Sequence, residues 1–179
     1  TCALPIFLGT RLPGCFNVFE MSVRAVLGQQ ITVKAASTLA ARLVAVYGTQ
    51  VQTGIEGLTH SFPAPAAILA LGENISEHLG KLGIISARAN TIYQLARVLA
   101  DEKNDFGFCG NPEEEMQKLQ AIRGIGSWTA QYIAMRAMGW PDAFLPTDAG
   151  IKKALPDHTP KELQVLSEAW RPWRSYATV

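Results

Sequence analysis

The sequence has few cysteines and no long apolar run. Its three cysteines, Cys2, Cys15 and Cys109, are odd in number and widely spaced, which fits neither a disulfide framework nor a tetrahedral metal site. We therefore expect free thiols in a reducing, intracellular setting. No stretch approaches the ~20 apolar residues of a membrane-spanning helix, and no secretory signal is recognisable. These residues exclude a disulfide-rich secreted domain and indicate no membrane contact.

The chain also lacks a strong net charge and long alternating β-branched runs. Sixteen Lys and Arg residues oppose 15 Asp and Glu residues, for a formal net charge of +1. The charge neither indicates nor excludes a polyanionic partner, because a local basic patch can supply phosphate contacts. Of the 179 residues, 48% are hydrophobic, with alanine and leucine abundant, so a sizeable core can be buried. We expect an all-α fold, as one domain or two small lobes.

Apolar residues recur at helical spacing along most of the chain. We expect helices at 16–28, 32–46, 65–71, 75–82, 86–99, 113–122, 127–137, 149–155 and 160–170, with a last one starting near Pro172. Thr32 is the expected N-cap of the second helix. The segments 48–65 and 101–112 are expected connectors. The sequence thus predicts nine or ten helices and no convincing strand.

A glycine turn at Arg123-Gly124-Ile125-Gly126 separates two of these helices. Glycine permits sharp turns because it has no Cβ. The second helix begins near Ser127, and its first N–H groups, with the helix dipole, form a ready phosphate site. We expect Gly124, Gly126 and the N–H groups of Ser127 to Thr129 to hold a DNA phosphate. The alternative is an ordinary αα-hairpin, since a short glycine motif is weak evidence alone.

The sequence motif around the glycine turn is a more specific indication of function than the turn itself. Leu-x-x-Ile-x-Gly-Ile-Gly-x-Trp-Thr-Ala at 119–130, followed by Leu-Pro-Thr-Asp at 145–148, resembles the helix-hairpin-helix motif and aspartate of the Gly/Pro-Asp superfamily of base-excision DNA glycosylases. Trp128 and the tail Trp-Arg-Pro-Trp-Arg-Ser-Tyr-Ala at 170–177 narrow the resemblance to the 3-methyladenine DNA glycosylase II family. It extends from about Arg11 to the end of the chain.

The resemblance implies that Asp148 is the catalytic carboxylate. The residue types alone favour a helix N-cap there, because Asp is a preferred capping residue. A base alkylated on a ring nitrogen is already cationic and leaves readily, so it needs little of the acid catalysis that ordinary glycosides require. Asp148 would then stabilise positive charge developing on the deoxyribose and orient or deprotonate the attacking water. The resemblance implies no cofactor for this step, and a monovalent cation at the hairpin carbonyls as an inessential ligand.

Two aromatic residues on the helix after the turn are the expected base pocket. By resemblance Trp128 stacks on the flipped base, and Tyr132, one turn on, lies on the same face. Their π faces would favour cationic alkylated bases, although an aromatic residue on a first helical turn is also a common core residue. Lyase-competent relatives such as endonuclease III carry a Schiff-base lysine at the position of Trp128. We therefore expect a monofunctional glycosylase that leaves an abasic site.

Gln30 is the expected DNA wedge. A base inside a duplex must be flipped out and the gap filled, and Gly28-Gln29-Gln30 resembles the intercalating loop of the family, in which close relatives carry leucine at the position of Gln30. Apolar and amide side chains both fill an unstacked step. The alternative is an exposed polar loop.

These features lead to a two-lobed helical fold with an interlobe cleft. One lobe would combine 1–20 with 138–179 and carry Asp148, and the other would span 21–137, with the helix-hairpin-helix at 113–137. The N-terminal β-rich domain of the family is absent, and from the ends at Thr1 and Val179 we expect a fragment of a longer protein. The expected reaction is removal of alkylated purines from duplex DNA in base excision repair, by a monomer that, in a bacterium, would act in the cytoplasm at the nucleoid.

Three alternatives stay open. A non-catalytic helix-hairpin-helix DNA-binding module would need the hairpin and no aspartate. A glycosylase for a mismatched or oxidised base is disfavoured, because the chain lacks both the hairpin lysine and the C-terminal cluster cysteines of other superfamily members. Fusion to a regulatory alkyl-transfer protein concerns residues outside this chain.

Overall fold

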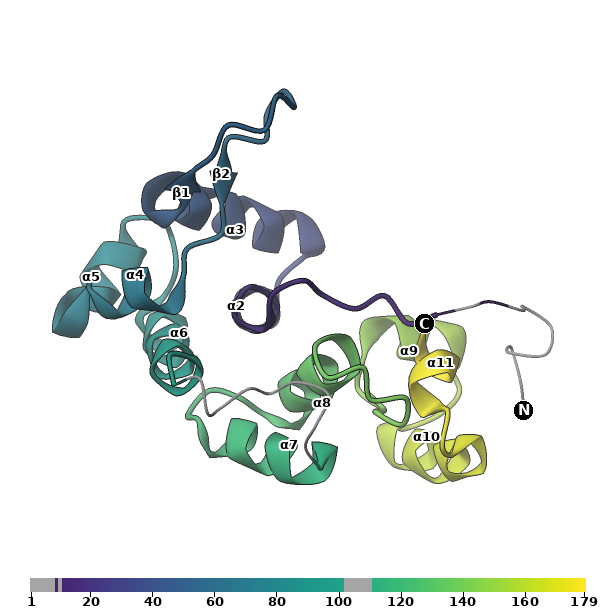
Figure 1. Ribbon diagram of the computed structural model, residues 1–179. Coiled ribbons are helices and arrows are strands. Elements are labelled where there is room, and N and C mark those ends of the chain that lie inside the picture. Colours follow the sequence, from purple (N-terminus) through teal and green to yellow (C-terminus); the bar gives the residue numbers. More distant parts are fainter. Residues whose placement is uncertain (1–8, 10, 102–110) are drawn as a thin grey trace. The chain divides into compact units, whose positions relative to one another are not determined.

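The computed structural model describes residues 9, 11–101 and 111–179, and within them the fold is all-α, as predicted, with ten α-helices (Figure 1). The helices are α2 Val18–Leu27, α3 Val33–Tyr47, α4 Pro65–Leu69, α5 Ile75–Gly80, α6 Ser86–Leu99, α7 Pro112–Ala121, α8 Ser127–Arg136, α9 Ala149–Ala154, α10 Pro160–Ser167 and α11 Arg174–Thr178. Two short 3-10 helices lie at Gly72–Asn74 and Glu168–Trp170. Among the residues described, no helix is both long and apolar enough to cross a membrane.

Short polar side chains mark where the first two of these helices begin. Asn17 accepts a hydrogen bond from Glu20 N at 2.8 Å to start α2. Thr32 accepts one from Ala35 N at 3.2 Å to start α3. Such caps replace the intrahelical partners that the first turn of a helix lacks. The prediction that Thr32 caps the second helix is confirmed.

The connector at 48–65 departs from the helical prediction. Strand β1, Thr49–Gln50, pairs antiparallel with β2, His60–Ser61. Each strand has two residues, whereas an alternating pattern becomes recognisable over four to eight residues. The sequence therefore carries no signal for this ladder.

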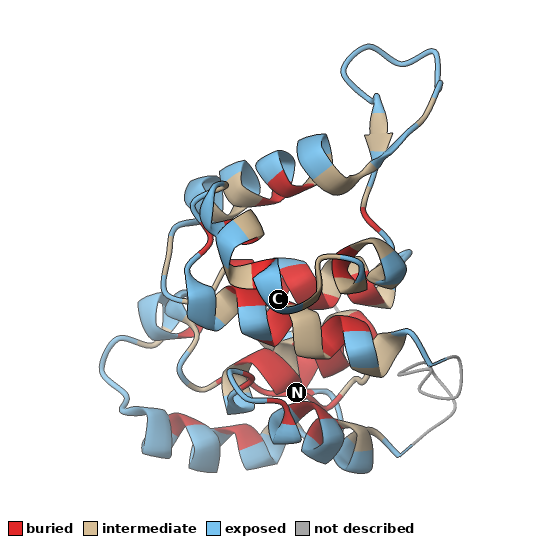
Figure 2. Cartoon of the chain, turned by 90° about the vertical axis from the view of Figure 1, so that its left-hand side faces the viewer, coloured by how far each residue is buried: buried red, intermediate tan, exposed pale blue. Residues whose placement is uncertain are grey.

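Contacts divide the chain into two compact units, and the first is organised around α6. It comprises the described residues within Asn17–Asp105 and Ala121–Ile125. Helices α2, α4 and α5 pack on α6, and α3 packs on α2 (Figure 1). Most helices carry both buried and exposed residues (Figure 2). The core of this unit includes the fully buried side chains of Val23, Leu27, Leu43, Ile68, Leu79, Ile92 and Leu95.

The second unit comprises the described residues within Thr1–Phe16, Phe106–Gln120 and Gly126–Val179. In one of its clusters Met135, Ala143 and Leu145 are buried, and Leu12, Trp128, Tyr132 and Trp140 pack against them. In another, Phe144, Ile151 and Leu163 are buried beneath Leu155 and Trp170. These contacts group α8 with the C-terminal helices, whereas the division expected from sequence placed 113–137 with the central ones.

Candidate active site

Asp148 ends the irregular segment 137–148 and starts α9. Its Oδ1 accepts a hydrogen bond from Gly150 N at 2.8 Å, so the residue is the N-cap that its type favours. Its Oδ2 accepts from Trp128 Nε1 at 3.3 Å. The carboxylate is partly exposed. Capping thus engages only one carboxylate oxygen, and the other oxygen contacts Trp128. Asp148 can therefore cap α9 and have a second role.

Trp128 and Tyr132 lie one turn apart on α8 and stack on each other. Their ring centroids are 5.2 Å apart and their planes are inclined by 7°. Both rings are half-buried and pack on the cluster that contains Met135 and Leu145. Half-burial is compatible with both interpretations of these aromatics, core packing and a surface for a ligand.

Arg136 was not singled out from the sequence, yet it lies at this aromatic pair. Its guanidinium carbon is 6.0 Å from the centroid of the Tyr132 ring. Its Nε is buried and has no hydrogen-bond partner among the described residues. In the sequence Arg136 is simply the basic residue of the last turn of α8, where a positive charge interacts favourably with the helix dipole.

The glycine turn has the local geometry that the sequence indicates. Gly124 has φ +96°, in the region where a Cβ is strained, and Ile125 N donates to Ile122 O at 3.0 Å. Gly126 is the N-cap of α8, and Ala130 N donates the first bond of that helix to Gly126 O at 3.0 Å. Ser127 is exposed, whereas Thr129 is buried, at 3% exposure.

The two glycines of the turn differ in their surroundings. A Cβ at Gly124 would overlap the side chain of Thr91 from α6, whose hydroxyl donates to Arg123 O at 2.9 Å. A Cβ at Gly126 would have nothing within 4 Å. Gly124 therefore serves the fold, while the space beside Gly126 is open to a ligand.

Gln30 follows α2 in a left-handed conformation. Its φ is +56°, and its side chain is exposed. The neighbouring Gln29 donates from Nε2 to Gly124 O at 2.9 Å, and Arg88 of α6 donates to Gln29 O. The loop of Gln30 and the glycine turn are thus joined within one unit. Arg88 and Thr91 were not predicted from the sequence, nor was the contact of Gln29 with Gly124. The one available signal was Thr91, a polar residue on the apolar face of α6.

The structure brings the predicted residues together in two groups. Asp148, Trp128 and Tyr132 lie in one unit, and the loop of Gln30 meets Gly124 in the other. Across residues 9, 11–101 and 111–179, no three His, Cys, Asp or Glu side chains are arranged to hold a metal ion. Cys2 and Cys109 lie outside the described residues.

The chain matches a known class of DNA repair proteins over most of its length. The model of the HhH-GPD superfamily of base excision DNA repair proteins matches residues 23–174, and the chain belongs to this superfamily. It is 38% identical over 169 residues to DNA-3-methyladenine glycosylase 2 of Escherichia coli, covering 94% of this chain and 58% of that protein. It is 41% identical over 175 residues to the probable bifunctional transcriptional activator/DNA repair enzyme of Mycobacterium tuberculosis, covering 95% of this chain and 34% of that protein.

Solved structures with these features share the fold. The 3-methyladenine DNA glycosylase from Archaeoglobus fulgidus matches with a TM-score of 0.78 and 25% identity, covering 93% of this chain and 57% of that one. A 3-methyladenine DNA glycosylase of Schizosaccharomyces pombe, solved with abasic DNA, matches in fold with a TM-score of 0.73 and 20% identity, covering 96% of this chain and 82% of that one. The chain therefore spans between a third and four fifths of the lengths of the proteins compared here.

Proposed function

We propose that this chain is a monofunctional DNA glycosylase that hydrolyses the N-glycosidic bond of alkylated purines, of the 3-methyladenine and 7-methylguanine type, in base excision repair. The observation that carries the proposal is the hydrogen bond from Trp128 Nε1 to Asp148 Oδ2 at 3.3 Å. It places a carboxylate beside an aromatic surface, the two elements that removal of a cationic base requires. The names of the relatives from Escherichia coli and Archaeoglobus fulgidus support the same substrate class.

Asp148 is the catalytic residue of this proposal. Departure of an alkylated base leaves positive charge on the deoxyribose, and a fixed carboxylate stabilises charge that develops there. Oδ1 is engaged with Gly150 N, so Oδ2 is the oxygen that acts on the sugar or on the attacking water. Trp128 orients that oxygen. The step needs no metal ion or organic cofactor.

The aromatic pair would bind the extruded base on its outer side. A centroid separation of 5.2 Å leaves no room for a base between Trp128 and Tyr132, because stacking rings on both sides of a base would need roughly twice a 3.5 Å contact. The base therefore stacks on the outer face of Trp128. An electron-rich indole face attracts a cationic base more than a neutral one.

The glycine turn and the Gln30 loop would hold the DNA. The N–H groups at the start of α8, from Ser127 to Thr129, would contact a phosphate oxygen, because the N-terminus of a helix favours anions. Gly126 leaves the space that a phosphate needs, and Gln30 would fill the gap that the flipped base leaves. A monovalent cation at the hairpin carbonyls, including that of Gly124, is an inessential addition. The partner is duplex DNA, bound by a monomer in a bacterial cytoplasm.

The test is release of free bases from methylated duplex DNA, followed by chromatography. The proposal predicts 3-methyladenine and 7-methylguanine in the supernatant and strands that break only after alkali, because Trp128 stands where a lyase has lysine. Duplexes with 8-oxoguanine serve as the control and should release nothing. Release of the oxidised base alone would favour the other-lesion alternative, and DNA binding without any release would favour the non-catalytic module.

A further inference from the structure

The segment that carries Asp148 has no regular secondary structure, so its course depends on neighbouring elements. One side of the segment 137–148 is held by α8. Trp140 N donates to Ala134 O at 3.0 Å, and Phe144 N donates to the side-chain oxygen of Gln131 at 3.2 Å. Trp128, which contacts Asp148, is on the same helix. These bonds fix the segment relative to one helix only.

The other side of the segment is held by the first turn of α11. Ser175 N donates to Pro141 O at 2.9 Å. The single hydroxyl hydrogen of Ser175 is shared between the carbonyls of Trp140, at 2.8 Å, and Ala143, at 3.0 Å. Ser175 and Ala143 are fully buried. One serine therefore binds three backbone carbonyls of a four-residue stretch.

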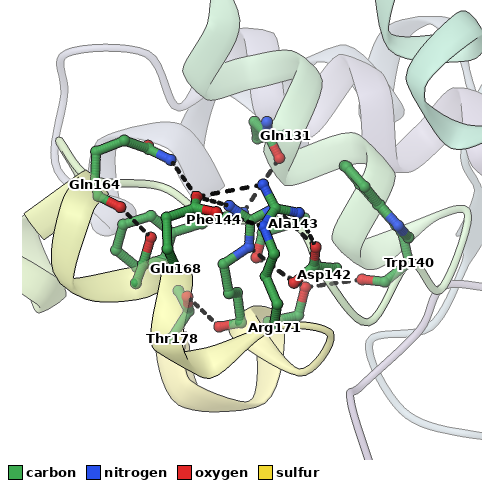
Figure 3. Close-up of polar contacts among 12 residues, drawn as sticks. Gln131, Trp140, Asp142, Ala143, Phe144, Gln164, Glu168, Arg171 and Thr178 are labelled. Atoms are coloured by element: carbon green, nitrogen blue, oxygen red, sulfur yellow. Dashed lines mark hydrogen bonds and ion pairs between the residues drawn. The ribbon is translucent and has the colours of Figure 1, made fainter.

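Beside this serine, Arg174 and Asp142 form a buried bidentate ion pair. Figure 3 shows the polar contacts around Asp142, with Arg171 and Glu168 close to it. Arg174 donates from Nε to Asp142 Oδ1 at 2.8 Å and from Nη2 to Oδ2 at 2.9 Å. Their side chains are 5% and 9% exposed, respectively. A planar fork on a carboxylate fixes direction as well as distance.

Arg171 and Glu168, which are more exposed, also interact with this ion pair. Arg171 also donates to Asp142, and Glu168 accepts from Arg171 Nε at 2.6 Å and from Arg174 Nη1 at 3.2 Å. Hydrogen bonding to Arg171 lowers the pKa of Glu168. Two carboxylates thus face two guanidinium groups, and the buried pair carries no net uncompensated charge.

The residues between Asp142 and Asp148 couple the positions of these two aspartates through packing. Ala143 and Leu145 are buried in the cluster on which Trp128 packs, and Phe144 is buried in the cluster under Trp170. Close-packed side chains pass a displacement on, because they leave few voids to absorb it. A shift at Asp142 therefore moves Asp148 relative to Trp128.

We propose that Asp142, Arg174 and Ser175 are positioning residues that place Asp148 against Trp128. The inference rests on the proposed function, in which Asp148 acts on the sugar. The ion pair and the serine hold α11 against residues 140–143 of the segment, and Asp148 lies at its C-terminal end. Their effect on the reaction passes through the segment, and none of the three needs to contact DNA.

The test compares Ser175→Ala and Asp142→Asn with the wild type and with Leu43→Ala. Ser175→Ala removes two hydrogen bonds without leaving a buried charge, so it remains informative if Asp142→Asn fails to fold. Leu43→Ala lowers stability in the unit that lacks Asp148, which makes it the matched control. All proteins are assayed at a temperature at which each is folded.

The first readout is the single-turnover excision rate, set against affinity for abasic-site DNA. Small misplacements of a reacting group cost up to ~10²-fold in rate, so we expect losses of about 10-fold for Ser175→Ala and about 100-fold for Asp142→Asn. Affinity should change less than about threefold, since no DNA contact is removed. Rates that fall no further than that of Leu43→Ala would overturn the proposal.

The second readout does not depend on the catalytic activity of the protein. The indole N–H resonance of Trp128, assigned with Trp128→Phe, reports on its bond to Asp148. We expect it to shift in both positioning variants and to stay in place in Leu43→Ala. If the wild type releases no base, the proposed function fails while this resonance still decides the inference, and an unshifted resonance in the variants would refute it.

Discussion

The side chain of Trp128 makes two different contacts, one through its ring and one through its N–H group. Its ring stacks on Tyr132 at 5.2 Å, and its N–H donates to Asp148 at 3.3 Å. The helical period predicts the first contact, because the two aromatics are one turn apart. The second joins residues 20 positions apart through an irregular segment, and no local pattern specifies it.

A conservative substitution separates these contacts. Trp128→Phe keeps an aromatic ring for stacking and removes the donor to Asp148. A hydrogen bond to a charged group contributes about 1.5–3 kcal/mol, so we expect the single-turnover excision rate to fall at least ~10-fold, with affinity for abasic-site DNA little changed.

The control for that variant is Tyr93→Phe on α6, in the unit that lacks Asp148, which loses only a phenol hydroxyl. Its excision rate should match that of the wild type. Equal losses in the two variants, or no loss in Trp128→Phe, would remove Trp128 Nε1 from the mechanism.

At the scale of single elements, the hairpin turn contains two glycines with different requirements. Gly124 needs its positive φ and the close approach of Thr91, whereas Gly126 has an ordinary φ of −88° and open space. The sequence shows the two residues as equivalent members of one motif. Only the packing of α6 behind the turn distinguishes them.

Paired substitutions test this difference. Gly124→Ala should lower the free energy of unfolding by about 1–3 kcal/mol through strain and the clash with Thr91. Gly126→Ala should change it by less than about 0.5 kcal/mol, yet weaken DNA binding, because its methyl group would occupy the space proposed for a phosphate. Urea denaturation and fluorescence anisotropy measure the two quantities. Unchanged DNA binding by Gly126→Ala would place the phosphate elsewhere.

The start of α10 gives a pH-dependent prediction. Thr159 and Glu162 form a capping box, and the hydrogen bond from Thr159 N lowers the pKa of Glu162. A carboxyl with a lowered folded pKa contributes stability that is present above its unfolded pKa and is lost as the pH falls through the folded value. The melting temperature of the wild type should therefore exceed that of Glu162→Ala at pH 7, and the gap should narrow under acid. A gap that does not depend on pH would contradict this assignment.

Helix positions were the most predictable part of this fold. The interval 86–99 is found as predicted, and α3 and α8 begin at the residues expected from Thr32 and Gly126. Trp128 and Asp148 were proposed as site residues from the family resemblance, and their side chains are in hydrogen-bond contact in the structure. The contacts that hold the segment of Asp148 were not predictable from the sequence. Asp142 and Arg174 are 32 positions apart, and neither belongs to a periodic pattern.

At the scale of the whole molecule, the chain passes between its two units several times. The turn residues Ala121–Ile125 belong to one unit, while the residues on both sides of them belong to the other. Periodicity identified the apolar face of α8 but not its partner, which is the segment of Ala143 and Leu145. For that reason the division expected from sequence placed this helix with the central helices.

The central claim is that Asp148 acts in base excision as well as capping α9. Asn caps a helix as well as Asp does, so Asp148→Asn retains the cap and removes the charge. The measurement is release of 3-methyladenine and 7-methylguanine from methylated duplex DNA by the wild type and Asp148→Asn, with the exposed Asp157→Asn as control. We expect a loss of at least ~10²-fold for Asp148→Asn alone, with unchanged melting temperature and DNA affinity. Equal release by all three proteins would contradict the claim.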